Sequence, residues 1–240
     1  MSRQASILIV DDEPLLAEIT AEWLRRNGFS ALTAENGSQA WNILQETKVD
    51  IVISDVRMPI MDGVALLQKI ISSGSEAPHV ILVTGHADFD RRTAYDLGVE
   101  TVLDKPVHRV QLIDAMHRML NTKEQAWSTV PPPCESATLR NSFKSLADAI
   151  SRGFIALGRG GLCIASSSYL PGVCVPLNLR FAADRQSIVG QGVVRWSDCD
   201  QQRMGVEIAY LEEDCREWVI RLLAGVALPS FIPRETSVTR

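Results

Sequence analysis

Five polar residues, each placed at the end of a short apolar run, are the side chains of this sequence best suited to act together. They are Asp11, Asp12, Asp55, Thr84 and Lys105. The runs that precede them span residues 6–10, 51–54, 80–83 and 101–104. Carboxylates hold divalent cations, whereas a hydroxyl and an ammonium can contact the oxygens of a phosphoryl group. These residue types therefore indicate cation-assisted phosphoryl chemistry, if the fold brings them to one place.

The elements that must position these residues alternate along the chain. Each apolar run has the length of a strand, and the segments between the runs have helical spacing. This alternation predicts a parallel sheet with helices on both faces. Ligands of such sheets gather at the carboxyl ends of the strands, so we expect all five side chains at one edge. The first helix is expected to bury one apolar face, formed by Leu15, Leu16, Ile19 and Trp23.

From residue 5 to about residue 120, these motifs resemble the receiver domain of bacterial two-component response regulators. The resemblance implies a flavodoxin-like α/β fold with a five-stranded parallel sheet. It implies that Asp55 is the phosphoryl acceptor and that Thr84 follows the phosphoryl oxygens. Lys105 would pair with the same oxygens, next to a cis peptide bond to Pro106. A cognate histidine kinase is the partner that such a domain implies.

The same resemblance assigns a Mg²⁺ ion to the acidic residues. Asp11, Asp12 and Asp55 would supply carboxylate oxygens, and the main-chain carbonyl of Arg57 would complete the protein ligands. Mg²⁺ neutralises charge on a phosphoryl donor, which allows a carboxylate to act as the nucleophile. Catalysis of this kind consists mainly of positioning and electrostatics. We therefore expect a signalling protein that catalyses only its own phosphotransfer and dephosphorylation.

Composition is typical of a globular protein, and we expect it in the cytoplasm. The 240 residues leave room for two domains, and 46% of them are hydrophobic. No apolar run approaches a membrane span, and no charged and then apolar leader opens the chain. Residues 1–125 carry 12 basic against 18 acidic residues, and residues 126–240 carry 12 against 11. The second half is therefore not basic enough to predict a DNA-binding surface.

Cysteine and histidine usage argues against a metal centre or redox pair in the second half. All five cysteines lie there without a C-x-x-C motif: Cys134, Cys163, Cys174, Cys199 and Cys215. In a cytoplasmic protein we expect them to be reduced thiols. All four histidines lie in the first half. A histidine-based enzyme is therefore not expected in the second.

A proline-containing segment, residues 123–152, is expected to join two domains. Pro131–Pro133 interrupt the pattern and stiffen the chain. Beyond them, apolar residues at helical spacing predict a connector helix or a dimer contact: Leu139, Phe143, Leu146 and Ile150. The predicted division is a receiver at 1–122, this linker with its helix, a second domain at 153–228 and a tail at 229–240.

The second domain has the pattern of short strands separated by turns. Strands are expected at residues 154–157, 162–165, 173–181, 187–196 and 204–210, and a helix at 212–224. This order predicts a small antiparallel β-barrel with a C-terminal helix.

Four short motifs of this domain resemble the PilZ domain, a bacterial module that binds cyclic di-GMP in many members. They are Gly160-Gly161-Leu162, Leu170-x-Gly172-x-x-Val175, Gly190-x-Gly192-Val193-Val194-Arg195-Trp196 and Met204-Gly205-Val206-Glu207-Ile208. The ligand motifs are altered, because Ala156 and Gly158 take the Asp and Ser positions of the D-x-S-x-x-G turn. The remaining candidates for a nucleotide site are Arg140, Lys144, Arg152, Arg159 and Gly161.

Three functions are compatible with this sequence. The first is a phosphorylation-controlled regulator whose PilZ-like domain contacts a protein partner. The second is the same regulator with an unusual cyclic di-GMP site, and the altered ligand motifs favour the first over it. The third is a DNA-binding response regulator, which the scarcity of helices after residue 150 disfavours. Pairing of receivers into a homodimer stays open.

Overall fold

The computed structural model of the chain describes residues 4–74, 77–85, 89–166, 169–224, 228 and 230–234. Contacts divide the chain into two units. The first contains residues 1–90 and 97–120, and the second contains residues 91–96 and 121–240. None of the helices in the described part of the chain is long and apolar enough to cross a membrane.

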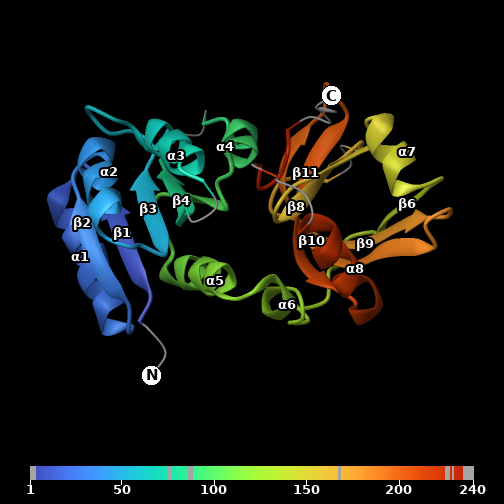
Figure 1. Cartoon of the computed structure of the whole chain (residues 1–240), viewed down its shortest axis with the longest axis horizontal. Helices are drawn as coiled ribbons and strands as arrows, with labels where there is room; N and C mark the ends of the chain where they lie inside the picture. The colour runs from blue at the N-terminus through green and yellow to red at the C-terminus, as the bar shows by residue number, and fades with distance from the viewer. Residues whose placement is uncertain are drawn as a thin grey trace. The chain divides into compact units, whose positions relative to one another are not determined.

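A five-stranded parallel sheet forms the centre of the first unit, in the order β2-β1-β3-β4-β5 (Figure 1). Its strands are β1 (Ser6–Val10), β2 (Ser30–Ala34), β3 (Ile51–Asp55), β4 (His79–Thr84) and β5 (Thr101–Asp104). The helices that alternate with them are α1 (Pro14–Arg26), α2 (Gly37–Glu46), α3 (Gly63–Ser72), α4 (Arg91–Leu97) and α5 (Arg109–Leu120). The predicted parallel α/β fold is therefore confirmed.

The caps of the helices follow from local sequence. Asn36 begins α2 and accepts a hydrogen bond from the main-chain N–H of Gln39 at 3.0 Å. Asp62 begins α3 in the same way, with the N–H of Ala65 at 2.7 Å. Such side chains satisfy main-chain donors that the first helical turn leaves unpaired.

The apolar face of α1 differs from the prediction. Leu15, Leu16 and Ile19 are 74%, 43% and 52% exposed, whereas Ala17, Ala21 and Leu24 are buried. The buried stripe packs with the sheet and with Leu112, Ala115 and Met116 of α5. Because Ala side chains are small, this stripe allows α1 to approach the sheet closely. Helical spacing alone offered two apolar stripes and could not distinguish them.

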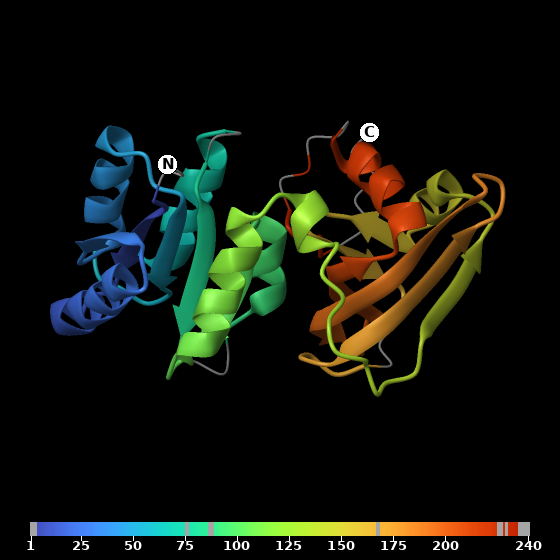
Figure 2. The same cartoon turned by 90° about the horizontal axis from the view of Figure 1, so that it is seen from below.

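A six-stranded sheet forms the second unit, in the order β6-β9-β10-β11-β8-β7, and it curls into half a barrel (Figure 2). Its strands are β6 (Leu139–Phe143), β7 (Ile155–Leu157), β8 (Gly161–Ile164), β9 (Cys174–Phe181), β10 (Gln186–Asp198) and β11 (Arg203–Leu211). Its further helices are α6 (Lys123–Ala126), α7 (Leu146–Ser151) and α8 (Glu213–Ala224). Cys215, Val219 and Leu223 of α8 complete its apolar core.

The expected antiparallel barrel needs two corrections. All five predicted strands are present, but β6 is an additional strand that pairs in parallel with β9, from Leu139 with Leu177 to Phe143 with Phe181. The strand order among the described residues begins at β6 and ends at β7, so this sheet does not close. One edge of β9 pairs with β10, and its other edge pairs with the preceding segment, β6.

The predicted connector helix across residues 139–150 is also wrong. Leu139 and Phe143 lie in β6, and only Leu146–Ser151 is helical. Residues four apart lie on one side of a strand as well as on one face of a helix. The spacing of these residues was therefore compatible with both structures.

The structure differs from two further expectations, which concern the cysteines and the C-terminal segment. Cys134 and Cys174, expected to be reduced, form a disulfide with their Cα atoms 5.5 Å apart. The pairing joins the linker to the start of β9, two segments that the sequence does not show to be neighbours. Ser230–Arg234, expected to belong to a tail, packs into the second unit, and Ile232 is fully buried. Residues 229 and 235–240 of that predicted tail lie outside the described residues.

Candidate functional site

The carboxyl ends of four neighbouring strands bring the five predicted residues to one edge of the first sheet. Asp11 and Asp12 follow β1, Asp55 ends β3, Thr84 ends β4 and Lys105 follows β5. These strands end at the same height in the sheet, as their pairing shows: Val10 pairs with Ser54, Asp55 with Val83, and Thr84 with Asp104. The sequence prediction of a shared edge is therefore confirmed.

Three carboxylates form the acidic part of this site. One oxygen from each of Asp11, Asp12 and Asp55 lies within 4.8 Å of the other two. The main-chain N–H of Glu13 donates to Oδ1 of Asp11 at 3.0 Å, which orients that carboxylate. A compact set of hard oxygen ligands with open space beside it fits a small divalent cation that keeps several waters. The residues present therefore fit Mg²⁺.

Lys105 supplies the positive charge of the site. Its Nζ lies 2.6 Å from Oδ2 of Asp55 and 3.3 Å from Oδ2 of Asp11. Partial burial opposes the charge of the ammonium, but the hydrogen bond to Asp55 and the charges of Asp11 and Asp55 outweigh it, so the pKa of Lys105 is raised. The ammonium therefore stays charged and holds two of the three carboxylates.

Thr84 and Arg57 flank this centre. Thr84 is fully buried, and its main-chain oxygen accepts a hydrogen bond from the N–H of Lys105 at 2.8 Å. The main-chain N–H of Arg57 lies 3.4 Å from Oδ1 of Asp55, while the Arg57 side chain is exposed. The peptide bond between Lys105 and Pro106 is cis.

Two supporting residues escaped the sequence prediction. The hydroxyl of buried Ser54 donates to the main-chain oxygen of Asp55 at 2.9 Å. Gly63 begins α3, and a Cβ there would lie 2.2 Å from the same oxygen. Only glycine therefore allows α3 to approach the end of β3 so closely. The Asp62-Gly63 pair before an apolar helical run was the signal that could have identified this contact.

An apolar cleft of about 570 Å³ adjoins the acidic cluster. Asp11, Asp55 and Lys105 line it on one side, and Leu16 and Ile19 of α1 line it on another. The exposed stripe of α1 therefore borders the residues that carry charge.

The nucleotide-site candidates of the second unit lie on different elements. Arg140 is on β6, Lys144 follows that strand, and both are exposed. Arg152 ends α7 and forms an ion pair with Asp148 at 3.2 Å. Arg159 lies in the turn between β7 and β8.

Gly161, the last candidate, has a structural role. It begins β8 and pairs with Glu207 of β11. A Cβ at Gly161 would lie 2.2 Å from the main-chain oxygen of Val206. The absence of a side chain therefore permits strand pairing, which accounts for this glycine without a ligand.

Comparison with known proteins finds relatives for the part of the chain that contains the acidic site. The family described as "Response regulator receiver domain" matches residues 7–117. The transcriptional regulatory protein GlrR of Escherichia coli K12 is 35% identical over 130 residues, which are 52% of this chain and 29% of that protein. The response regulator Rre1 of Synechocystis is 34% identical over 149 residues, 61% of this chain and 63% of that protein. This chain thus spans less than two thirds of either relative.

A solved structure was also found to be similar. The response regulator receiver domain protein from Clostridium thermocellum has a TM-score of 0.47 and 31% identity. The match covers 50% of this chain and 98% of that one.

Proposed function

We propose that this protein is a phosphorylation-dependent response regulator of a two-component system, because residues 7–117 match the response regulator receiver family. Asp55 is the proposed phosphoryl acceptor, and the second unit is the proposed output. The observation that carries the proposal is the position of Asp55 between two further carboxylates and the Lys105 ammonium.

The proposed reaction is nucleophilic attack by a carboxylate oxygen of Asp55 on the phosphorus of a donor. The new O–P bond forms as the bond to the leaving group breaks, which leaves an acyl phosphate on Asp55. Lys105, now on the Asp55 carboxylate, transfers its hydrogen bond to a phosphoryl oxygen. The Thr84 hydroxyl donates to another of these oxygens, and this movement carries the signal to β4 and α4.

Asp11, Asp12, Asp55 and the main-chain carbonyl of Arg57 are the proposed ligands of a Mg²⁺ ion. When bound, the ion neutralises charge on the phosphoryl group during transfer. The three carboxylates hold it, and without it the Lys105 ammonium offsets the repulsion between Asp11 and Asp55.

A histidine kinase is the proposed donor. Such a donor must bring a phosphorylated side chain to Asp55 and bind the surface beside it. The exposed Leu15, Leu16 and Ile19 of α1, next to the cleft at Asp55, offer an apolar surface for that contact.

The second unit is proposed to act as a PilZ-like output that contacts a protein partner. The half-barrel sheet, with α8 packed against its apolar core, supports the PilZ-like assignment. The structural role of Gly161 and the ion pair of Arg152 with Asp148 weaken the case for a nucleotide site. Cyclic di-GMP binding through the exposed Arg140 and Lys144 is the alternative. Calorimetric titration of the full chain with cyclic di-GMP distinguishes them, since micromolar binding would support the alternative.

Replacement of Asp55 with Asn tests the acceptor. We expect acetyl phosphate with Mg²⁺ to label the wild-type protein and to leave Asp55→Asn unlabelled, because an amide is not a nucleophile toward phosphorus. Mass spectrometry of the intact protein measures the added phosphoryl group. The matched control is Asp114→Asn, a change at an exposed carboxylate of α5, which should be labelled normally. Labelling of Asp55→Asn at the wild-type rate would refute the proposal.

A further inference from the structure

The C-terminal segment Ser230–Arg234, which we call the strap, lies between α4 and a turn of the second unit. This turn, Gly158–Gly161, is called the glycine turn and joins β7 to β8. Residues 91–96 of α4 belong to the second unit by their contacts, although they lie within the receiver sequence. The strap therefore touches both a receiver helix and the turn at which the PilZ-like motif is altered.

The contact of the strap with the glycine turn is close and uses main-chain groups. The N–H of Arg159 donates to the oxygen of Ser230 at 2.9 Å, and the N–H of Gly160 donates to that of Phe231 at 3.1 Å. A Cβ on Gly160 would lie 2.0 Å from the Phe231 ring, and one on Gly158 would lie 2.3 Å from the Phe231 oxygen. The glycines thus fit this segment, and both donors are occupied by it.

The strap is joined to α4 through a second set of bonds. The N–H of Phe231 donates to the oxygen of Tyr95 at 3.0 Å. Asp96 accepts two bonds at Oδ1, each 3.0 Å long, from the Ser230 hydroxyl and the Arg234 N–H. The rings of Tyr95 and Phe231 stack with centroids 6.5 Å apart. Tyr95 and Ile232 are buried, so the strap is packed as well as hydrogen-bonded.

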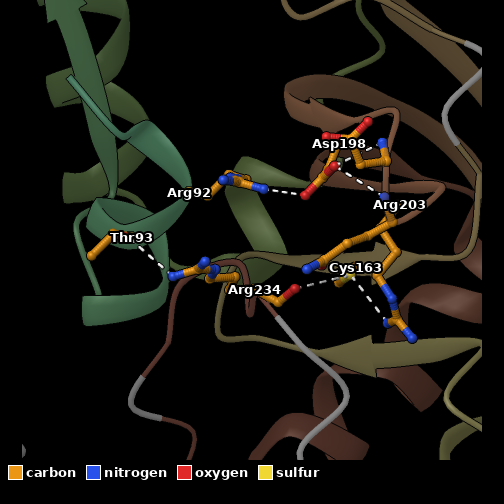
Figure 3. A network of polar contacts seen from close by, with 8 residues as sticks. Arg92, Thr93, Cys163, Asp198, Arg203 and Arg234 are labelled. Atoms are coloured by element: carbon orange, nitrogen blue, oxygen red, sulfur yellow. Dashed lines mark hydrogen bonds and ion pairs between the residues drawn. The ribbon is translucent and has the colours of Figure 1, made fainter. Parts of the chain in front are cut away.

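Side chains extend this junction on either side, as Figure 3 shows. Arg234 reaches Thr93 of α4 at 3.5 Å, and Cys163 of β8 donates to the Arg234 oxygen at 3.8 Å. Arg92 of α4 forms an ion pair with Asp198 at the end of β10. The pKa of Asp198 is lowered, because the hydrogen bond from the main-chain N–H of Gln201, together with the charge of Arg92 and the N–H of Asp200, outweighs the opposing effect of desolvation.

We propose that the strap is an autoinhibitory contact that couples α4 to the glycine turn. The strap accepts hydrogen bonds from the main-chain N–H groups of Arg159 and Gly160. It does so in the state in which Asp55 is unmodified and Lys105 contacts its carboxylate. Phosphorylation of Asp55, the function proposed above, shifts α4 and thereby weakens the bonds at Tyr95 and Asp96. The released turn then offers the same donors to an extended segment of a protein partner.

Hydrogen exchange of the full-length protein tests this coupling. We expect beryllofluoride with Mg²⁺, a mimic of the phosphoryl group, to speed exchange of the Arg159 and Gly160 amides by on the order of 10-fold, since each hydrogen bond contributes modestly. Asp55→Asn should show no such change. Unchanged exchange at both amides in a wild-type protein that acetyl phosphate does label would overturn the strap and leave the receiver function intact.

Two variants test the link without a phosphoryl mimic. Asp96→Ala removes two bonds to the strap, and Phe231→Ala removes the ring that lies on Gly160 and Tyr95. Each should speed exchange at Arg159 and Gly160, whereas Asp114→Ala on α5 should not. Coupling between two sites is reciprocal. The Asp96→Ala protein should therefore bind beryllofluoride more tightly than the wild type, by the same factor by which beryllofluoride weakens the strap contact in the wild type. Equal affinity in Asp96→Ala and wild type would contradict the coupling, even if Phe231→Ala fails to fold.

Discussion

Lys105 shows how one side chain sets the electrostatics of the acidic cluster. Its ammonium contacts Asp55 and Asp11, two of the three carboxylates that fit a cation. The same charge that offsets their repulsion also repels a second cation nearby. Because the pKa of Lys105 is raised above 10.5, its stabilising contribution is fully present below pH 10.5 and lost only as the pH rises through the raised value.

Replacement of Lys105 with Met should therefore change two properties in opposite directions. Mg²⁺ should bind on the order of 10-fold more tightly, because a nearby positive charge is removed. Labelling by acetyl phosphate should be slower by on the order of 100-fold, because a charge that stabilises the transferring group is lost. Calorimetry and labelling kinetics measure the two, with the exposed Lys48→Met as control. Weaker Mg²⁺ binding would instead indicate that Lys105 only holds the carboxylates in place.

Glycines at strand and turn positions decide how the elements of the second unit meet. Gly161 permits β8 to lie against β11, where a Cβ would lie 2.2 Å from the Val206 oxygen. Gly172 differs, since nothing lies within 4 Å of a Cβ there and the backbone has a φ of 89°. One glycine is thus required by packing, and the other by conformation.

Alanine substitution should separate these two requirements. We expect Gly161→Ala to lower the free energy of unfolding by about 3 kcal/mol, because main-chain atoms of a neighbouring strand must move. Gly172→Ala should cost about 1 kcal/mol, the strain of a left-handed conformation. Urea denaturation measures both. If Gly161→Ala were as stable as Gly172→Ala, the close approach of β8 to β11 would not be required.

The two units of the whole molecule do not follow the order of the chain. Residues 91–96 join the second unit, although they lie within the segment that matches the receiver family. The second unit is further closed by the disulfide between Cys134 and Cys174, which are 40 residues apart. Such a bond stabilises mainly by restricting the unfolded chain.

Loss of the disulfide should destabilise the second unit and spare the chemistry of the first. Cys134→Ser should lower the free energy of unfolding by about 4 kcal/mol, the value expected for a loop of this length. Acetyl phosphate should still label Asp55. Cys199→Ser, at an exposed free thiol, is the matched control and should leave stability unchanged. Urea denaturation with and without a reductant measures the difference, and an unchanged midpoint for Cys134→Ser would show that the bond contributes nothing.

The sequence by itself indicated four of the five strands of the first sheet and the edge at which Asp11, Asp12, Asp55, Thr84 and Lys105 meet. It could do so because strand ends in a parallel sheet share one edge, which makes local patterns sufficient. It also identified five strands and the last helix of the second unit.

Tertiary structure alone decided the remaining features. The buried stripe of α1, the strand at Leu139–Phe143, the disulfide and the strap each depend on a partner far away in the sequence. The spacing of apolar residues shows that a segment will be buried, but it does not show which other segment of the chain will cover it. Those partners are fixed only when distant segments compete for the same surface in the folded chain.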